Sequence, residues 1–112
     1  MTYCEIKDGD PICLAIQGEL SVDAAAEARS AALEIFETGA EAMIVDLSEV
    51  TSIASPGVGF VATLHHSAEG KGIKVIFMSP APFVLEVLKV TGLAEILNFA
   101  ADADEAAKMI QG

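Results

Sequence analysis

The stretch from Met43 to Gly59 reads Met-Ile-Val-Asp-Leu-Ser-Glu-Val-Thr-Ser-Ile-Ala-Ser-Pro-Gly-Val-Gly, and it decides how the chain is organised. An apolar run ending in Asp46-Leu47 predicts a short buried strand. The segment from Ser48 to Ser52 indicates a polar connection. Ser55-Pro56-Gly57 then predicts a helix start with Ser55 as N-cap, because a serine hydroxyl accepts from a backbone N–H and proline has none to leave unbonded. The sequence thus brings one hydroxyl to a helix start just past a strand, the usual place for function in open α/β sheets.

Upstream, a β-hairpin is expected. Residues 2–7 and 11–17 read as two strands, and Asp8-Gly9 between them is a type I′ turn signal. This turn would put Cys4 directly opposite Cys13, and these are the only cysteines of the chain. Two hypotheses follow, a redox pair or two small buried thiols in a reducing compartment.

Helices are expected on both sides of the organising strand. The first would begin at Ser21 and end near Thr38, and the second would end near Gly70. The apolar positions at helical spacing are expected to be buried. In the first helix they are Val22, Ala25, Ala28, Ala32, Ile35 and Phe36, and in the second Phe60, Val61, Leu64 and Ala68.

The remaining third of the chain continues the alternation. Residues 73–78 predict a buried strand, Ser79-Pro80 a second Ser-Pro helix start, and residues 96–99 a last short strand. Asp102 with Glu105 three residues later indicates a capping box for a final helix. The third helix is expected to be lined by Phe83, Val84, Val87 and Leu88 and to end at Gly92, and the fourth carries Ala106, Met109 and Ile110. Strands alternating with helices after a hairpin predict one α/β domain, residues 1–112, whose sheet is mostly parallel with an antiparallel first strand at its edge.

Composition excludes several functions. Six basic and seventeen acidic residues give a net charge of −11, which repels nucleic-acid phosphates and anionic membrane surfaces and favours a basic patch on a partner. No apolar run approaches the roughly 20 residues that span a bilayer, and the N-terminus lacks the layout of a signal peptide. We therefore expect a cytoplasmic protein without membrane insertion.

Several short pieces, in this order and spacing, resemble one family. They are Gly18-Glu19-Leu20, Ile44-Val45-Asp46-Leu47-Ser48, Val50-Thr51, Gly57-Val58-Gly59, Ser79-Pro80, Val87-Leu88-Lys89-Val90-Thr91-Gly92-Leu93 and Glu105-Ala106-Ala107. The chain resembles the STAS domain family (sulfate transporter and anti-sigma factor antagonist), and within it the stand-alone bacterial anti-sigma factor antagonists. The resemblance implies the STAS fold, with a sheet of four to five strands, an N-terminal hairpin and about four helices. It also implies partner switching: the unphosphorylated antagonist binds an anti-sigma factor that is a serine kinase of the histidine-kinase-like ATPase type.

The chain departs from the family at the phosphorylation site. The family motif Asp-Ser-Ser-Gly reads Ala54-Ser55-Pro56-Gly57 here, so the usual phosphoacceptor aligns with Pro56. The aspartate that commonly follows Gly-Glu-Leu is Ser21. Ser55 is either an N-cap or a displaced phosphorylation site. The expected partner-binding residues are Ser21, Ala54, Ser55, Pro56, Gly57 and Val58.

Two alternative functions compete with that of an antagonist. The first is a cytosolic STAS subunit of a lipid or solute ABC transporter, bound to the transporter ATPase. Such a subunit is similar to this chain because it keeps a hydroxyl at the first serine position of the motif and lacks the second serine. An enzyme would need a base for Ser55 or a partner for Asp46, and the sequence offers neither. His65 and His66 are adjacent and diverge on a helix, so no metal site is expected, and no cofactor is implied. The helix N-terminus near Gly57 could bind an anion, but no phosphate-binding loop supports a nucleotide site.

Overall fold

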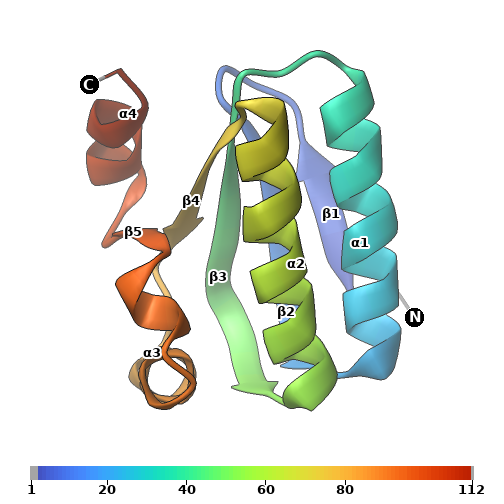
Figure 1. Cartoon of the computed structure of the whole chain (residues 1–112), viewed down its shortest axis with the longest axis vertical. Coiled ribbons are helices and arrows are strands. Elements are labelled where there is room, and N and C mark those ends of the chain that lie inside the picture. The colour runs from blue at the N-terminus through green and yellow to red at the C-terminus, as the bar shows by residue number, and fades with distance from the viewer. Residues whose placement is uncertain (1–2, 112) are drawn as a thin grey trace.

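A five-stranded sheet forms the centre of the molecule, and the computed structural model describes residues 3–111 of the chain (Figure 1). Strands and helices alternate after the first two strands, as the sequence predicts. The elements are β1 (Cys4–Lys7), β2 (Ile12–Leu20), α1 (Val22–Glu37), β3 (Ala42–Ile53), α2 (Ser55–Lys71), β4 (Lys74–Met78), α3 (Pro82–Val90), the 3-10 helix η1 (Leu93–Glu95), β5 (Asn98–Ala100) and α4 (Ala103–Gln111).

The strands lie in the order β1-β2-β3-β4-β5. Strand β1 pairs antiparallel with β2, whereas β2 with β3, β3 with β4, and β4 with β5 pair parallel. This confirms the predicted mostly parallel sheet with an antiparallel edge strand. Because the connections are crossovers, the helices that follow β2 and β3 both begin at the carboxyl-terminal edge of the sheet.

The two faces of the sheet are covered unequally. Helices α1 and α2 lie side by side across one face and bury the main core, to which α3 adds Val84 and Leu88 (Figure 1). On the other face α4 covers a small second cluster around Ile44 and Ile76. Lys74 on β4 holds α4 in place by donating to the backbone carbonyl of Met109 at 2.8 Å.

The hairpin prediction was wrong in its turn and in its register. Residues 8–11 connect β1 to β2, with a cis bond before Pro11, and Cys4 pairs with Ile16 instead of Cys13. The core decides this register, because Cys4 and Ile16 both lie on the buried face, and a slip would turn every side chain over. Residue 2, where the first strand was predicted to begin, lies outside the described residues.

Strand β3 is longer than the sequence indicates. Ser48 to Ser52 was predicted to be a polar connection, but β3 continues to Ile53 and pairs with β2 up to Leu20. Register shifts in the β2–β3 ladder accommodate the extra length, and Val50 stays buried in the core. Of the polar residues that suggested a loop, Ser48, Glu49 and Thr51 are exposed.

The outer strand β1 is protected by a carboxylate. Glu27 on α1 accepts hydrogen bonds from the backbone N–H of Tyr3, at 3.1 Å to each oxygen, and from that of Cys4 at 3.2 Å. These bonds, the one from Tyr3 most of all, lower the pKa of Glu27. An edge strand with unpaired N–H groups is a template for aggregation, and Glu27 occupies two of these groups.

Helix boundaries differ from the predictions at both Ser-Pro sequences. Helix α3 begins at Pro82, not at Ser79-Pro80, and Ser79 takes a positive φ of 56°. The N–H of Ser79 donates to the carbonyl of Ala100, and the hydroxyl of Ser79 donates to that of Ala101. These two hydrogen bonds tie the β4–α3 loop to the end of β5. Phe83, predicted to line the third helix, is therefore in the first turn of α3 and exposed.

The other carboxyl-terminal predictions are confirmed. Strands β4 and β5 form close to the expected positions, and Gly92 follows the end of α3 with a positive φ. The Asp102 carboxylate accepts from the N–H of Glu105 at 2.9 Å, which is one of the two hydrogen bonds of the predicted capping box. Ala106 of α4 is fully buried, and Met109 and Ile110 are half-buried beside it.

Candidate partner-binding site at the start of helix α2

The ends of β2 and β3 bring two predicted site segments together. Leu20 pairs with Ile53 at the end of the ladder, and the N–H of Ala54 continues it by donating to the Leu20 carbonyl at 3.2 Å. Ser21 follows directly as the N-cap of α1, and Ser55 directly as the first residue of α2. The starts of α1 and α2 therefore lie next to each other at one edge of the sheet (Figure 1).

Gly57 sets how closely α2 approaches this edge. It is buried, and a Cβ at this position would lie 2.5 Å from the Leu20 carbonyl oxygen, 2.7 Å from Leu20 Cγ and 2.9 Å from Ile53 Cγ1. No side chain fits there without displacing backbone. The absence of a side chain at Gly57 thus fixes the first turn of α2 against both strand ends and determines where Ser55 and Pro56 lie.

Ser55 is not the N-cap of α2, in contrast to the prediction. Ala54 is the N-cap: its backbone is extended, and its carbonyl accepts from the N–H groups of Gly57 and Val58 at 2.8 and 3.1 Å. Sheet pairing of Ala54 with Leu20, instead of a side-chain cap, defines where the helix begins. The Ser55 hydroxyl is consequently not used in capping, and Ser21, the N-cap of α1, makes no side-chain capping bond either.

The backbone at this helix start has little left to offer an anion. The N–H groups of Ala54, Gly57 and Val58 are bonded within the protein, and Pro56 has none. Only the Ser55 N–H remains for a ligand among these residues. The first turn of α2 also carries no acidic residue. The helix start thus presents an uncharged surface instead of a phosphate cradle.

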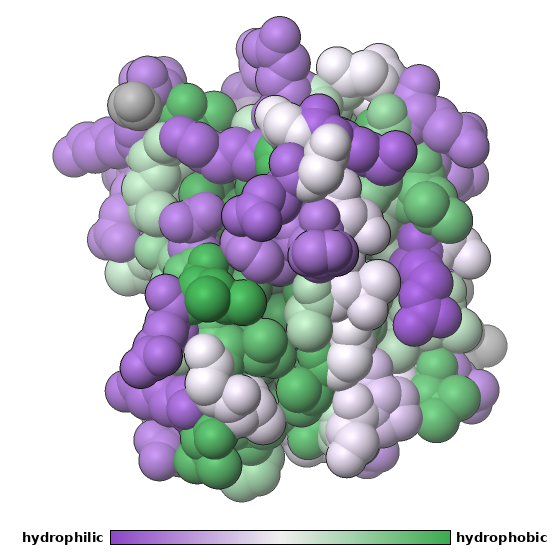
Figure 2. All heavy atoms as spheres, in the orientation of Figure 1, coloured by the Kyte–Doolittle hydropathy of each residue, from purple (hydrophilic) through white to green (hydrophobic). Residues whose placement is uncertain are grey.

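Uncharged residues are exposed at the start of α2, and apolar residues are exposed at the starts of α1 and α3. Ser55 and Pro56 are exposed, and Val58 is half-buried. At the start of α1 the Val22 side chain is 64% exposed, and in the first turn of α3 that of Phe83 is 61% exposed. Val22 was predicted to be buried and Phe83 to line the third helix, and their positions in the first turns of their helices were the available signal for exposure. Figure 2 shows that hydrophobic residues gather at this lower end of the molecule, while hydrophilic residues gather at the upper end.

The residues considered for catalysis or metal binding are not brought together with Ser55 among residues 3–111. No side chain in this range forms a hydrogen bond with Ser55. Asp46 lies in the first half of β3, away from the strand end that leads into α2. Its carboxylate accepts a hydrogen bond from the N–H of Ser48 at 2.9 Å. His65 pairs with Glu69 one turn on at 3.7 Å, and the described part of the chain contains no group of three metal-ligating side chains.

The two cysteines do not form a pair. Cys4 packs in the main core, whereas Cys13 packs against the second cluster, so the two thiols lie on opposite faces of the sheet. Both are free. Burial, with Glu27 as the next cause, raises the pKa of Cys4 to about 11, and burial with Asp46 raises that of Cys13. Of the two hypotheses, the geometry supports unreactive packing residues.

Comparison with known structures finds the same fold in regulatory proteins. A Thermotoga maritima protein assigned as an anti-sigma factor antagonist has a TM-score of 0.88 at 23% identity, covering 97% of this chain and 95% of its own. SpoIIAA, an anti-sigma factor antagonist, in its unphosphorylated form has a TM-score of 0.80 at 20% identity, with 97% and 96% covered. The phosphorylated form of the Bacillus cell-fate determinant SpoIIAA has a TM-score of 0.72 at 21% identity, with 96% and 98% covered. No curated protein sequence matches the chain significantly.

The family assignment follows from the sequence model together with the fold. The model of the STAS domain matches residues 4–106, which contain every strand and the start of the last helix. No helix among residues 3–111 has the length and the apolar character that crossing a membrane requires. The chain belongs to the STAS domain family.

Proposed function

We propose that this STAS domain is a non-catalytic regulatory protein that binds its partner through the start of α2. The observation that carries the proposal is the exposed Ser55-Pro56 pair, held at the sheet edge by Gly57. Structural neighbours of this chain include anti-sigma factor antagonists, one of them known in a phosphorylated and an unphosphorylated form. The binding residues in this proposal are Ser21, Ala54, Ser55, Pro56, Gly57 and Val58.

The partner in this proposal is an anti-sigma factor with kinase activity. Phosphorylation at a helix start adds roughly −1.5 to −2 charge, which breaks an interface that has no basic group to receive it. Pro56 carries no hydroxyl, so that reaction is blocked at the aligned position. The protein would therefore act as a constitutively unphosphorylated antagonist, with its apolar surface always competent to bind.

Ser55 remains a candidate for a displaced phosphorylation site. Its hydroxyl is exposed and is not used for capping, so it is accessible to a kinase. A hydroxyl at Ser55 followed by a residue other than serine, here Pro56, also supports the second candidate function. That function is a cytosolic subunit of a lipid or solute ABC transporter. In that case the partner at α2 would be the transporter ATPase.

Affinity capture from the native organism separates these functions. The tagged chain is expressed at its natural level, captured with its complexes, and the bound proteins are identified by mass spectrometry. Capture of a histidine-kinase-like ATPase together with its sigma factor network supports the antagonist. Capture of an ATPase and a permease overturns it in favour of the transporter subunit. The Pro56→Glu variant, which places a charge at the helix start, must lose the captured partner in either case.

A further inference from the structure

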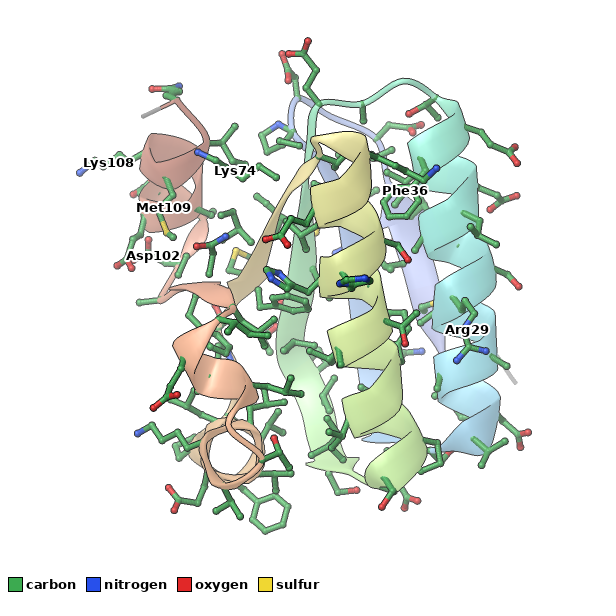
Figure 3. All side chains as sticks on the ribbon, viewed as in Figure 1. Arg29, Phe36, Lys74, Asp102, Lys108 and Met109 are labelled. Carbon is green, nitrogen blue, oxygen red and sulfur yellow. The ribbon has the colours of Figure 1, made fainter. Side chains whose placement is uncertain are left out.

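A shallow groove between α1 and α2 lies on the outer surface of the helical layer. It has a volume of about 120 Å³, and its apolar lining comes from Ala32, Leu33 and Phe36 on α1 and from Phe60 and Leu64 on α2. Three polar residues complete the lining: Arg29, Thr63 and Ser67. This space suits one branched aliphatic side chain. Figure 3 shows Phe36 reaching from α1 toward α2, with Arg29 nearer the start of the same helix.

One stripe of α1 borders this groove and carries an ordered set of charges. Arg29, Leu33 and Glu37 are spaced four residues apart, so they lie on one side of the helix. All three are exposed, and Leu33 is 53% exposed. Arg29 is the chain's one arginine, and in residues 3–111 its side chain forms no ion pair or hydrogen bond.

The stripe is complementary to itself. Arg29 precedes Leu33 by four residues and Glu37 follows it by four, about 6 Å along the helix axis in each direction. If two copies of α1 cross antiparallel at Leu33, Arg29 of each copy faces Glu37 of the other. A two-fold axis at Leu33 produces both contacts at once, as an isologous interface requires.

We propose that a second copy of this chain docks on the α1–α2 face, with Leu33 of each copy entering the groove of the other. The occupant is another copy and not an acidic or basic partner, because the stripe offers one charge of each sign at equal distances from its apolar centre. The net charge of −11 opposes association, and the contact involves two helices per copy. We therefore expect a weak dimer, with a dissociation constant on the order of 100 µM.

The dimer face leaves the proposed partner site open. The groove is lined by residues from the middle of α1 and of α2, whereas Ser55 and Pro56 are at the start of α2. A dimer would present two partner sites. The inference does not depend on the proposed function, and its test uses the purified chain alone.

Sedimentation velocity over a concentration series, at physiological ionic strength, tests the dimer with two charge reversals. Arg29→Glu makes the stripe acidic at both ends, and Glu37→Arg makes it basic at both ends. Each single variant should dimerise about tenfold more weakly than the wild type, because a reversal replaces two attractive contacts by repulsive ones. Lys108→Glu on α4 and Glu86→Arg on α3 are matched controls with the same change in net charge, and they should leave dimerisation within about twofold.

Two restorations distinguish a self-complementary stripe from a general charge effect. The double variant Arg29→Glu with Glu37→Arg should recover the wild-type dimer, because its charges are merely exchanged. An equimolar mixture of the two single variants should form a heterodimer, detectable when one of them carries a fluorophore. Failure of both restorations, or a wild-type chain that remains monomeric at about 1 mM, overturns the proposal. Leu33→Asp should also give a monomer with an unchanged circular dichroism spectrum, and a persistent dimer in that variant would contradict the position of the axis.

Discussion

Gly57 packs on Leu20 so closely that a methyl group on its Cα would lie 2.5 Å from the Leu20 carbonyl oxygen. The same carbonyl accepts the Ala54 N–H at 3.2 Å. One backbone oxygen at the end of β2 therefore positions both the last residue before α2 and its first turn. The geometry of the proposed partner site depends on this contact.

Gly57→Ala should accordingly destabilise the fold by about 1–3 kcal/mol, because the helix start or the strand end must move to admit the methyl group. Gly59→Ala is the matched control in the same helix: a Cβ there meets nothing within 4 Å, so the replacement should stabilise by about 0.5–1 kcal/mol. Urea denaturation of the two variants gives both free energies. Equal stability of Gly57→Ala and Gly59→Ala would contradict the packing described.

Glu27→Gln should lower stability at neutral pH and lose its effect in acid. The hydrogen bonds from Tyr3 and Cys4 lower the folded-state pKa of Glu27, so its contribution is fully present above the ordinary glutamate pKa and is lost as the pH falls through the lowered pKa. Denaturation of wild type and variant, from neutral pH down to below the lowered pKa of Glu27, measures the difference between their free energies of unfolding. Glu34→Gln on the same helix, which forms no hydrogen bond to β1, is the control, and a gap that stays constant with pH would count against the assignment.

Pro56→Ser should convert the chain into a better substrate for its partner kinase. The change restores a hydroxyl at the aligned phosphoacceptor position, and serine is tolerated in the first turn of a helix. Transfer of radiolabelled phosphate from ATP is measured for wild type, Pro56→Ser and Pro56→Ser with Ser55→Ala. The wild type should remain unlabelled, and the last variant should keep the label. A wild-type chain labelled at Ser55 would show instead that the phosphorylation site has moved by one residue.

The sequence was sufficient for the order of elements and for placing the candidate residues at the starts of two helices. Apolar periodicity and Gly39 and Gly92 after the first and third helices mark the alternation, whereas α2 ends at Lys71, before Gly72, where the sequence indicated an end near Gly70. The family pieces lie at the edge where α1 and α2 start. The structure also places Ser21, Ala54 and Gly57 around Leu20. Local patterns carry this information because each lies within one element.

What the sequence missed depends on contacts between distant segments. Residues 48–52 look like a loop, but pairing with β2 keeps them in β3. Ser55 looks like a cap, but the bond from Ala54 to Leu20 starts the helix one residue earlier. The hairpin register follows burial of Cys4 and not the Asp8-Gly9 signal. In each case a long-range pairing overrides the preference of the local sequence.

The measurement that tests the central claim most directly is the affinity of the captured ATPase for three purified forms of the chain: wild type, Pro56→Glu and Ala103→Glu. The last variant adds the same charge at the first residue of α4, which packs on the opposite face of the sheet. If the start of α2 is the partner-binding surface, calorimetric titration should show Pro56→Glu weakened by about tenfold or more, with Ala103→Glu close to wild type. Equal binding by wild type and Pro56→Glu would contradict the claim and place the partner elsewhere on the molecule.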